Sequence, residues 1–180
     1  VLKGSVATND MLDLDITGNN INISKIRNYF PEKYYALAAD YNPSGILNVR
    51  CKIKGILNSL ANPHIEIDWQ LDKGNITSRK SKLAVKDLAF TGQFSNGSKN
   101  RNETSSVLIN DFNAKFGSSE YRGLLKISRL DKPHTELILK GRILPSEIKE
   151  FFDLNKISTA EGSVDVDLNL VTDFWPKDKI

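Results

Sequence analysis

The sequence is poor in cysteine, in methionine and in long apolar runs. It has one Cys and one Met among 180 residues, so an internal disulfide framework is excluded. No apolar run approaches the roughly 18 residues of a membrane-spanning helix, and no signal-peptide pattern is present. The chain does not begin with Met, and its first residues already have the pattern of a strand. We therefore expect a soluble piece excised from a longer protein.

An excess of charge of one sign is also lacking. The chain has 25 Lys and Arg residues against 22 Asp and Glu residues, and the basic residues are scattered along it. A nucleic-acid-binding surface would need basic residues gathered on one face. We therefore expect no nucleic-acid partner.

Motifs of catalysis and cofactor binding are missing as well. The sequence has no Gly-rich phosphate loop, no Cys-x-x-Cys, no His-Glu-x-x-His and no Gly-x-Ser-x-Gly. The carboxylate pairs Asp13/Asp15 and Asp165/Asp167 could suggest acid–base chemistry. Each pair lies two residues apart on the polar side of an alternating segment, where a charged outer face explains it. We expect no catalytic residue, no cofactor and a protein that is not an enzyme.

Two segments share the pattern Pro-His-x-Glu, at 63–66 and 133–136. Pro is tolerated at the first residue of a strand, so each segment should open one. Neither His64 nor His134 has a Cys or a second His nearby, which makes a poor metal-ligand set. We expect two surface histidines and no metal.

Alternation of apolar and polar residues with period two dominates the chain. It predicts strands with one apolar and one solvated face, as in antiparallel sheets. Turn residues recur at short intervals, which favours a meander of hairpins. Residues 95–106 lack any apolar side chain and should form a mobile hairpin loop. Cys51 should be a buried small residue on the apolar side.

An internal repeat organises the chain. A strand ending in Gly is followed by a Ser expected to cap a short amphipathic helix, and then by a strand that starts with Gly, at about 10–60 and again at about 133–172. A hairpin meander at about 61–132 lies between the copies, within a single β-rich region. A further helix is predicted over 32–40. The helix residues expected to cover the apolar face of the sheet are Ile26, Tyr29, Phe30, Ile148, Phe151 and Phe152.

The strands present more apolar area than the few helices can cover, and exposing it costs about 25 cal/mol per Å². The sheet could therefore form a sandwich, curl over a helix as a closed or half-closed roll, or stay partly open around an apolar ligand. We predict a mainly β fold: a curved antiparallel sheet, a half-barrel or roll built from repeats, with two or three short helices on its apolar face. The residues expected to line an apolar groove are Leu47, Val49, Cys51, Ile53, Ile65, Ile67 and Trp69.

These elements together resemble the AsmA family of bacterial envelope proteins. The resemblance rests on the strand ending in Gly18, the Ile-Ser-x-Ile-x-x-Tyr-Phe-Pro segment at 23–31, the strand ending Lys-Ile-Lys-Gly at 52–55, and Asn-Pro-His-x-Glu at 62–66. It covers nearly the whole chain, most clearly 10–76 and 120–172. The Asn- and Lys-rich composition is similar to versions from Bacteroidetes.

The resemblance implies a periplasmic β-rich part of a protein anchored in the inner membrane. Its role would be in outer-membrane biogenesis and lipid homeostasis, with phospholipid acyl chains held in an apolar β-groove, and other envelope proteins as further partners. The family has no catalytic residues to carry over. Two alternatives remain open: a closed periplasmic scaffold or protein-interaction module, and a carbohydrate-binding β-sandwich.

Overall fold

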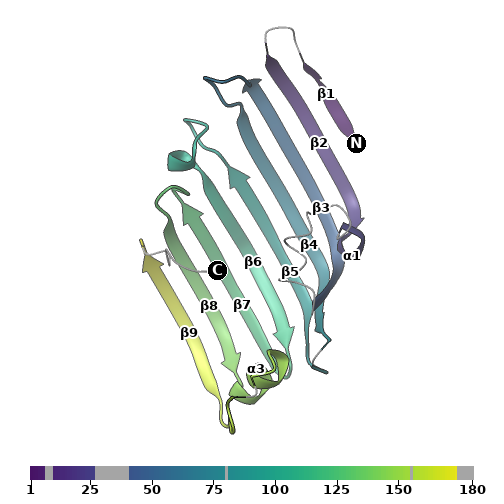
Figure 1. Cartoon of the computed structure of the whole chain (residues 1–180), viewed down its shortest axis with the longest axis vertical. Helices are drawn as coiled ribbons and strands as arrows, with labels where there is room; N and C mark the ends of the chain where they lie inside the picture. Colours follow the sequence, from purple (N-terminus) through teal and green to yellow (C-terminus); the bar gives the residue numbers. More distant parts are fainter. Residues whose placement is uncertain (7–9, 27–40, 80, 155, 174–180) are drawn as a thin grey trace.

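The structure, a computed structural model, describes residues 1–6, 10–26, 41–79, 81–154 and 156–173. Nine strands form one antiparallel sheet, and each strand pairs with its neighbours in the chain, in the order β1 to β9 (Figure 1). The sheet is open, because β1 pairs only with β2 and β9 only with β8 among the described strands. The strands are β1 (Leu2–Val6), β2 (Met11–Asn22), β3 (Tyr41–Ile56), β4 (His64–Ser78), β5 (Ala84–Ser95), β6 (Ser106–Phe116), β7 (Ser119–Ser128), β8 (His134–Ile143) and β9 (Val164–Thr172).

The described helical segments are short and lie between strands. They are α1 (Ile23–Ile26), the 3-10 turn η3 (Asn102–Thr104) and α3 (Pro145–Phe151). A strand, a helix and a second strand therefore follow one another in both copies of the sequence repeat, β2-α1-β3 and β8-α3-β9. The predicted fold class, mainly β with a curved antiparallel sheet and a few short helices, is confirmed, and the sheet is not closed.

One face of the sheet is apolar from edge to edge, because paired residues of antiparallel strands point to the same side. Two neighbouring rows show this continuity across the strands. The first row, from β2 to β7, is Ile16, Cys51, Ile67, Phe94, Val107 and Ile127. The second row, from β3 to β9, is Val49, Trp69, Gly92, Ile109, Leu125, Leu137 and Leu170.

β-Bulges keep this face apolar where the alternation of the sequence changes phase. The register shifts in β2, β4, β5 and β6, and one residue with positive φ lies at each shift: Asn20 (53°), Lys73 (52°), Asp87 (51°) and Asp111 (52°). Each extra residue reverses which of the following positions, odd or even, have side chains on the apolar face. Ile109 and Phe112 therefore share a face although three positions separate them. A bulge also bends its strand and increases the twist. These bulges thus shape the sheet and preserve its two-faced character.

The opposite face carries cross-strand ion pairs. Arg50 Nη2 lies 2.9 Å from Asp15 Oδ2, and Lys126 Nζ lies 2.8 Å from Glu136 Oε1. The hydrogen bond from Arg50 is the main cause that lowers the pKa of Asp15, and the bond from Lys126 does the same for Glu136. All these side chains are well exposed, so each pair adds little to stability. Their arrangement marks this face as the solvated one.

Helix α3 crosses one end of the sheet (Figure 1). Phe151 is 5% exposed and packs edge-to-face on Phe116 of β6, with ring centroids 5.0 Å apart, and stacks on Tyr41 of β3 at 5.6 Å. Glu147 Oε1 accepts hydrogen bonds from the backbone N–H and the hydroxyl of Ser118, in the β6–β7 turn. These contacts fix the helix on the apolar face.

The expectation that a Ser caps each repeat helix was wrong. Neither repeat Ser caps its helix: the Asn22 carboxamide accepts the hydrogen bond from the N–H of Ser24, while α3 starts at Pro145, whose fixed φ suits a first helical position. The segment at 95–106, which lacks apolar side chains, contains the turn η3 and is joined to the start of β4 by hydrogen bonds. Asn96 is 7% exposed, donates from Nδ2 to the Pro63 carbonyl and accepts from the Ile65 N–H, so side-chain hydrogen bonds replace apolar packing.

Candidate functional site

The seven predicted groove residues form one patch on the apolar face of β3 and β4. Val49 pairs with Trp69, Cys51 with Ile67, and Ile53 with Ile65. Leu47 completes the patch opposite Leu71. The patch has apolar neighbours on both sides, with β2 on one and β5 on the other. The structure therefore brings together all seven residues that the sequence places in the groove.

The patch is only half-buried. Each of the seven side chains retains an intermediate solvent exposure. Among the described residues, the buried apolar side chains are Pro63, Leu71, Ala114, Phe116 and Phe151, and the last two of these lie under or within α3. A core sealed by a second layer would bury most of its aliphatic side chains almost fully. This face has the exposure of a surface that can receive a ligand.

Trp69 gives the patch its largest side chain, and its position depends on a glycine. Its cross-strand partner in β5 is Gly92, and a Cβ added there would collide with the indole atoms Cε2, Nε1 and Cζ2. The indole thus lies flat over the Gly92 backbone. This arrangement leaves the ring on the surface of the sheet.

Cys51 lies in the middle of the patch. Burial is the main cause that raises the pKa of its thiol, and the negative charge of Asp15 adds to it. A thiol with a raised pKa is a poor nucleophile at neutral pH. Cys51 therefore acts here as a small apolar side chain.

The helix residues expected to cover the apolar face differ in how deeply they are buried. Ile148 is half-buried and Phe151 is buried, as expected of a cover. Phe152 follows the last residue of α3 and is 51% exposed. The rings of Tyr41 and Phe151 pack against part of its ring, and the rest is in contact with solvent. Tyr29 and Phe30, the helix predicted over 32–40 and the side chain of Ile26 lie outside the described residues.

The apolar face continues to the β9 edge with rising exposure. Leu168 is 37% and Leu170 is 40% exposed, and Val164 at the start of the strand is 53% exposed. Their partners in β8 are Leu139, Leu137 and Ile143. The apolar surface therefore stays accessible to solvent up to the β9 edge.

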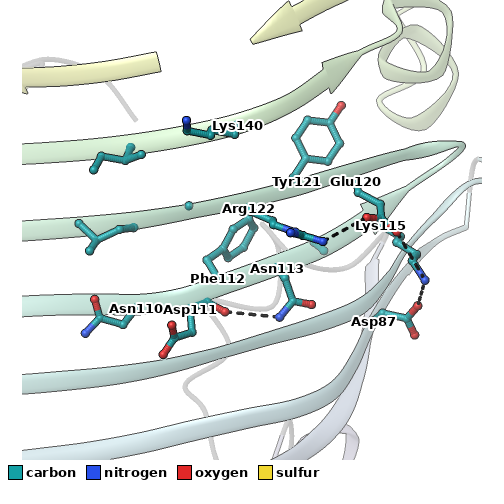
Figure 2. A pocket seen from close by; sticks show the side chains of 14 residues that line it. Asp87, Asn110, Asp111, Phe112, Asn113, Lys115, Glu120, Tyr121, Arg122 and Lys140 are labelled. Atoms are coloured by element: carbon teal, nitrogen blue, oxygen red, sulfur yellow. Dashed lines mark hydrogen bonds and ion pairs between the residues drawn. The ribbon is translucent and has the colours of Figure 1, made fainter. Parts of the chain in front are cut away.

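A hollow of about 730 Å³ on the polar face was not anticipated (Figure 2). It lies beside the bulges at Asp87 and Asp111, where the strand spacing is disturbed. Lys115 pairs within it with Asp87 at 3.0 Å and with Glu120 at 3.9 Å. The whole lining has three carboxylates (Asp87, Asp111 and Glu120) and three cations (Lys115, Arg122 and Lys140), so the hollow favours no charged ligand of either sign. Its sequence signal was the change of phase within 84–95 and 106–116, which indicates bulges.

The two Pro-His-x-Glu segments make the same local contact. His64 Nε2 lies 3.3 Å from Glu66 Oε1, and His134 Nε2 lies 3.9 Å from Glu136 Oε1. The hydrogen bond to Glu66 is the main cause that raises the pKa of His64. The described residues hold no group of three or more His, Cys, Asp or Glu side chains that could bind a metal ion. The repeated motif thus serves strand entry and pairing.

No family model, curated protein or solved structure matches the chain. In the described part of the chain, no helix is both long and apolar enough to cross a membrane.

Proposed function

We propose that this domain holds the acyl chains of lipids on the apolar face of its sheet. The observation that carries the proposal is the half-exposure of the Leu47–Trp69 patch, together with its continuation to Leu170 at the β9 edge. Leaving such a surface exposed to water costs about 25 cal/mol of free energy per Å² of apolar area. An acyl chain would remove that cost and needs no directional hydrogen bond from the patch.

The character of the two faces supports this choice of ligand. The polar face pairs its charges across strands, as in Arg142 with Asp165 at 2.7 Å, and keeps them in solvent. The apolar face carries aliphatic side chains in continuous rows, and α3 covers it at one end. A one-sided, strip-like apolar surface suits long flexible hydrocarbon chains. The resemblance to the AsmA family supports the same ligand and a place in the bacterial cell envelope, as a non-enzymatic part of a membrane-anchored protein.

The two alternatives predict other features. A closed scaffold should bury its apolar face, and the half-exposed patch does not favour it. A carbohydrate-binding surface should present aromatic side chains on a rim. Here Tyr41, Phe116 and Phe151 gather at α3, which does not favour sugar binding.

Trp69 offers a direct test in vitro. In a Trp175→Phe background Trp69 is the only indole, because the chain has two Trp residues. Dibrominated stearate quenches indoles that it touches, so titration should quench Trp69 fluorescence in a saturable way that unlabelled oleate reverses. The matched control, Trp69→Phe with Gln70→Trp, moves the indole one residue along β4 and so to the polar face. It should show little quenching. Equal quenching of both variants, or none, would contradict the proposal.

A further inference from the structure

The hollow on the polar face has the size of a ligand-binding site. Its volume of about 730 Å³ lies within the range of small-molecule pockets, roughly 300–1,000 Å³. Strands β6, β7 and β8 supply most of its lining, and the bulge at Asp111 shapes one side of it (Figure 2). All of its lining residues belong to the described part of the chain. The placement of its charges decides what it can hold.

Two cations face each other in the lining of the hollow. Arg122 of β7 and Lys140 of β8 are direct cross-strand partners, a placement that costs free energy because like charges repel. Lys126 and Glu136, also direct partners on this face, carry opposite charges and lie 2.8 Å apart. The side chain of Arg122 is 77% exposed, and its contact with Glu120 is long, at 3.7 Å. An anionic group seated between Arg122 and Lys140 would relieve their repulsion.

Lys140 has donors left for a ligand although it already pairs with Asp167 of β9, 3.1 Å away. An ammonium group in this sheet can serve two carboxylates at once. Lys115 shows this, since its Nζ lies 3.0 Å from Asp87 and 3.9 Å from Glu120. Lys140 can therefore contact a second anion from the side of the hollow.

A carboxylate without a cation lines the hollow on the β6 side. Asp111 forms no ion pair with a described residue, and its carboxylate accepts only a long hydrogen bond, 3.5 Å, from the Thr91 hydroxyl. Two apolar side chains, Leu124 and Ile138, pair across β7 and β8 and line the hollow as well, and Ile138 is 39% exposed. The hollow therefore offers a negative group, an apolar surface and a pair of positive groups to a single ligand.

We propose that the hollow binds a small zwitterion, an ω-amino carboxylate with a short aliphatic chain. Its ammonium group pairs with Asp111, and its carboxylate pairs with Arg122 and Lys140. The aliphatic chain between them lies on Leu124 and Ile138. At the usual strand spacing β6 lies about 7 Å from the midpoint between β7 and β8, which a chain of several carbons spans.

A zwitterion also suits the balance of charge in the hollow. The lining has equal numbers of carboxylates and cations, so it favours a ligand without net charge. This site is separate from the lipid proposal, because it lies on the opposite face of the sheet. Either proposal can fail without the other.

The probe is ε-aminocaproate, and its matched controls are caproate and hexylamine, each of which lacks one of the two charged groups. An NMR titration of the isotope-labelled 180-residue chain should show saturable shifts at 110–113, 122–124 and 138–140. Each control should bind at least about tenfold more weakly, because it loses one charge-assisted contact. Equal binding of a control, shifts confined to other segments, or no saturable binding would overturn the proposal.

Single substitutions separate the two ends of the ligand. Asp111→Asn introduces a residue that tolerates the φ of 52° at this bulge, and it should weaken ε-aminocaproate about tenfold without weakening caproate. Arg122→Gln should weaken both compounds. Lys126→Gln, on the polar side of the same strand but outside the hollow, should weaken neither.

The first two substitutions act at different ends of the ligand, so either of them decides the matter if the other chain does not fold. Unchanged affinity for ε-aminocaproate in a folded Asp111→Asn or Arg122→Gln chain would overturn the proposal. An equal loss in the Lys126→Gln chain would also overturn it, in favour of nonspecific attraction to the charged face.

Discussion

The indole of Trp69 lies over the backbone of Gly92, its partner across the β4–β5 pair. Gly92→Ala would place a methyl group inside the volume of the ring, so Trp69 must move or the strands must part. We expect a loss of about 1–3 kcal/mol in the free energy of unfolding, typical of an overpacked site, measured by urea denaturation. In the Trp175→Phe background the emission of Trp69 should also shift.

The control for this substitution is Gln93→Ala, on the polar face next to the same position, which should change stability by less than about 0.5 kcal/mol. If Gly92→Ala unfolded at the same urea concentration as the parent chain, the contact of Trp69 with Gly92 would not be the constraint described above.

The two aromatic residues at the end of α3 should differ in their contribution to stability. Phe151 is 5% exposed and Phe152 is 51% exposed. Truncation of a buried Phe costs roughly 3–5 kcal/mol, so Phe151→Ala should strongly lower the melting temperature, while Phe152→Ala should lower it much less. Equal losses in thermal denaturation would mean that both rings are buried equally.

The bulge at Lys73 should be sensitive to backbone preference. Lys73 adopts a φ of 52°, a region that most side chains avoid and Gly enters freely. Lys73→Gly should therefore stabilise the domain by roughly 0.5–1 kcal/mol, whereas Lys73→Val should destabilise it by at least as much. Lys73→Ala controls for loss of the side chain. The prediction fails if the Gly variant is less stable than the Ala variant in chemical denaturation.

These bulges illustrate how much of the fold the sequence contains. The alternation in 45–53 and 64–71 predicts two strands and the seven groove residues, because a half-buried strand must alternate. In 84–95 and 106–116 the apolar positions change parity, as between Ile109 and Phe112. That change is the local signal of a bulge, and the hollow of Figure 2 lies beside two such bulges.

Other features depend on contacts that local pattern does not encode. Phe151 and Phe152 are equivalent in the sequence, and only the contact of α3 with Tyr41 and Phe116 buries the first and leaves the second exposed. Likewise, the polar composition of 95–106 does not reveal that Asn96 accepts a hydrogen bond from the Ile65 N–H and donates one to the Pro63 carbonyl.

The His64–Glu66 pair should make stability depend on pH. The hydrogen bond to Glu66 raises the pKa of His64 above its ordinary value of 6.5. Because the folded-state pKa is the higher one, the stabilisation is complete below the unfolded-state pKa and is lost as pH rises through the folded-state value. The stability difference between the parent chain and Glu66→Gln should therefore shrink from pH 6 towards alkaline pH, by roughly the scale of one exposed pair.

NMR titration checks the same pair directly. The chain has two His residues, so His134→Gln assigns both ring signals. His64 should titrate above its ordinary pKa, and Glu66→Gln should bring the midpoint down. A His64 midpoint at or below the ordinary value would contradict the structure at this pair.

Site-specific photo-crosslinking in cells tests most directly whether the apolar face contacts lipid. A photoreactive residue replaces Val49 or Ile67 on the apolar face, or Arg50 on the polar face, in the full-length protein. The three positions lie on the paired strands β3 and β4, and Arg50 is the most exposed of them, so poor access would not explain a lack of adducts there. The account predicts phospholipid adducts, identified by mass spectrometry, at 49 and 67 but not at 50. Adducts with protein alone at 49 and 67, or equal lipid adducts at all three positions, would contradict it.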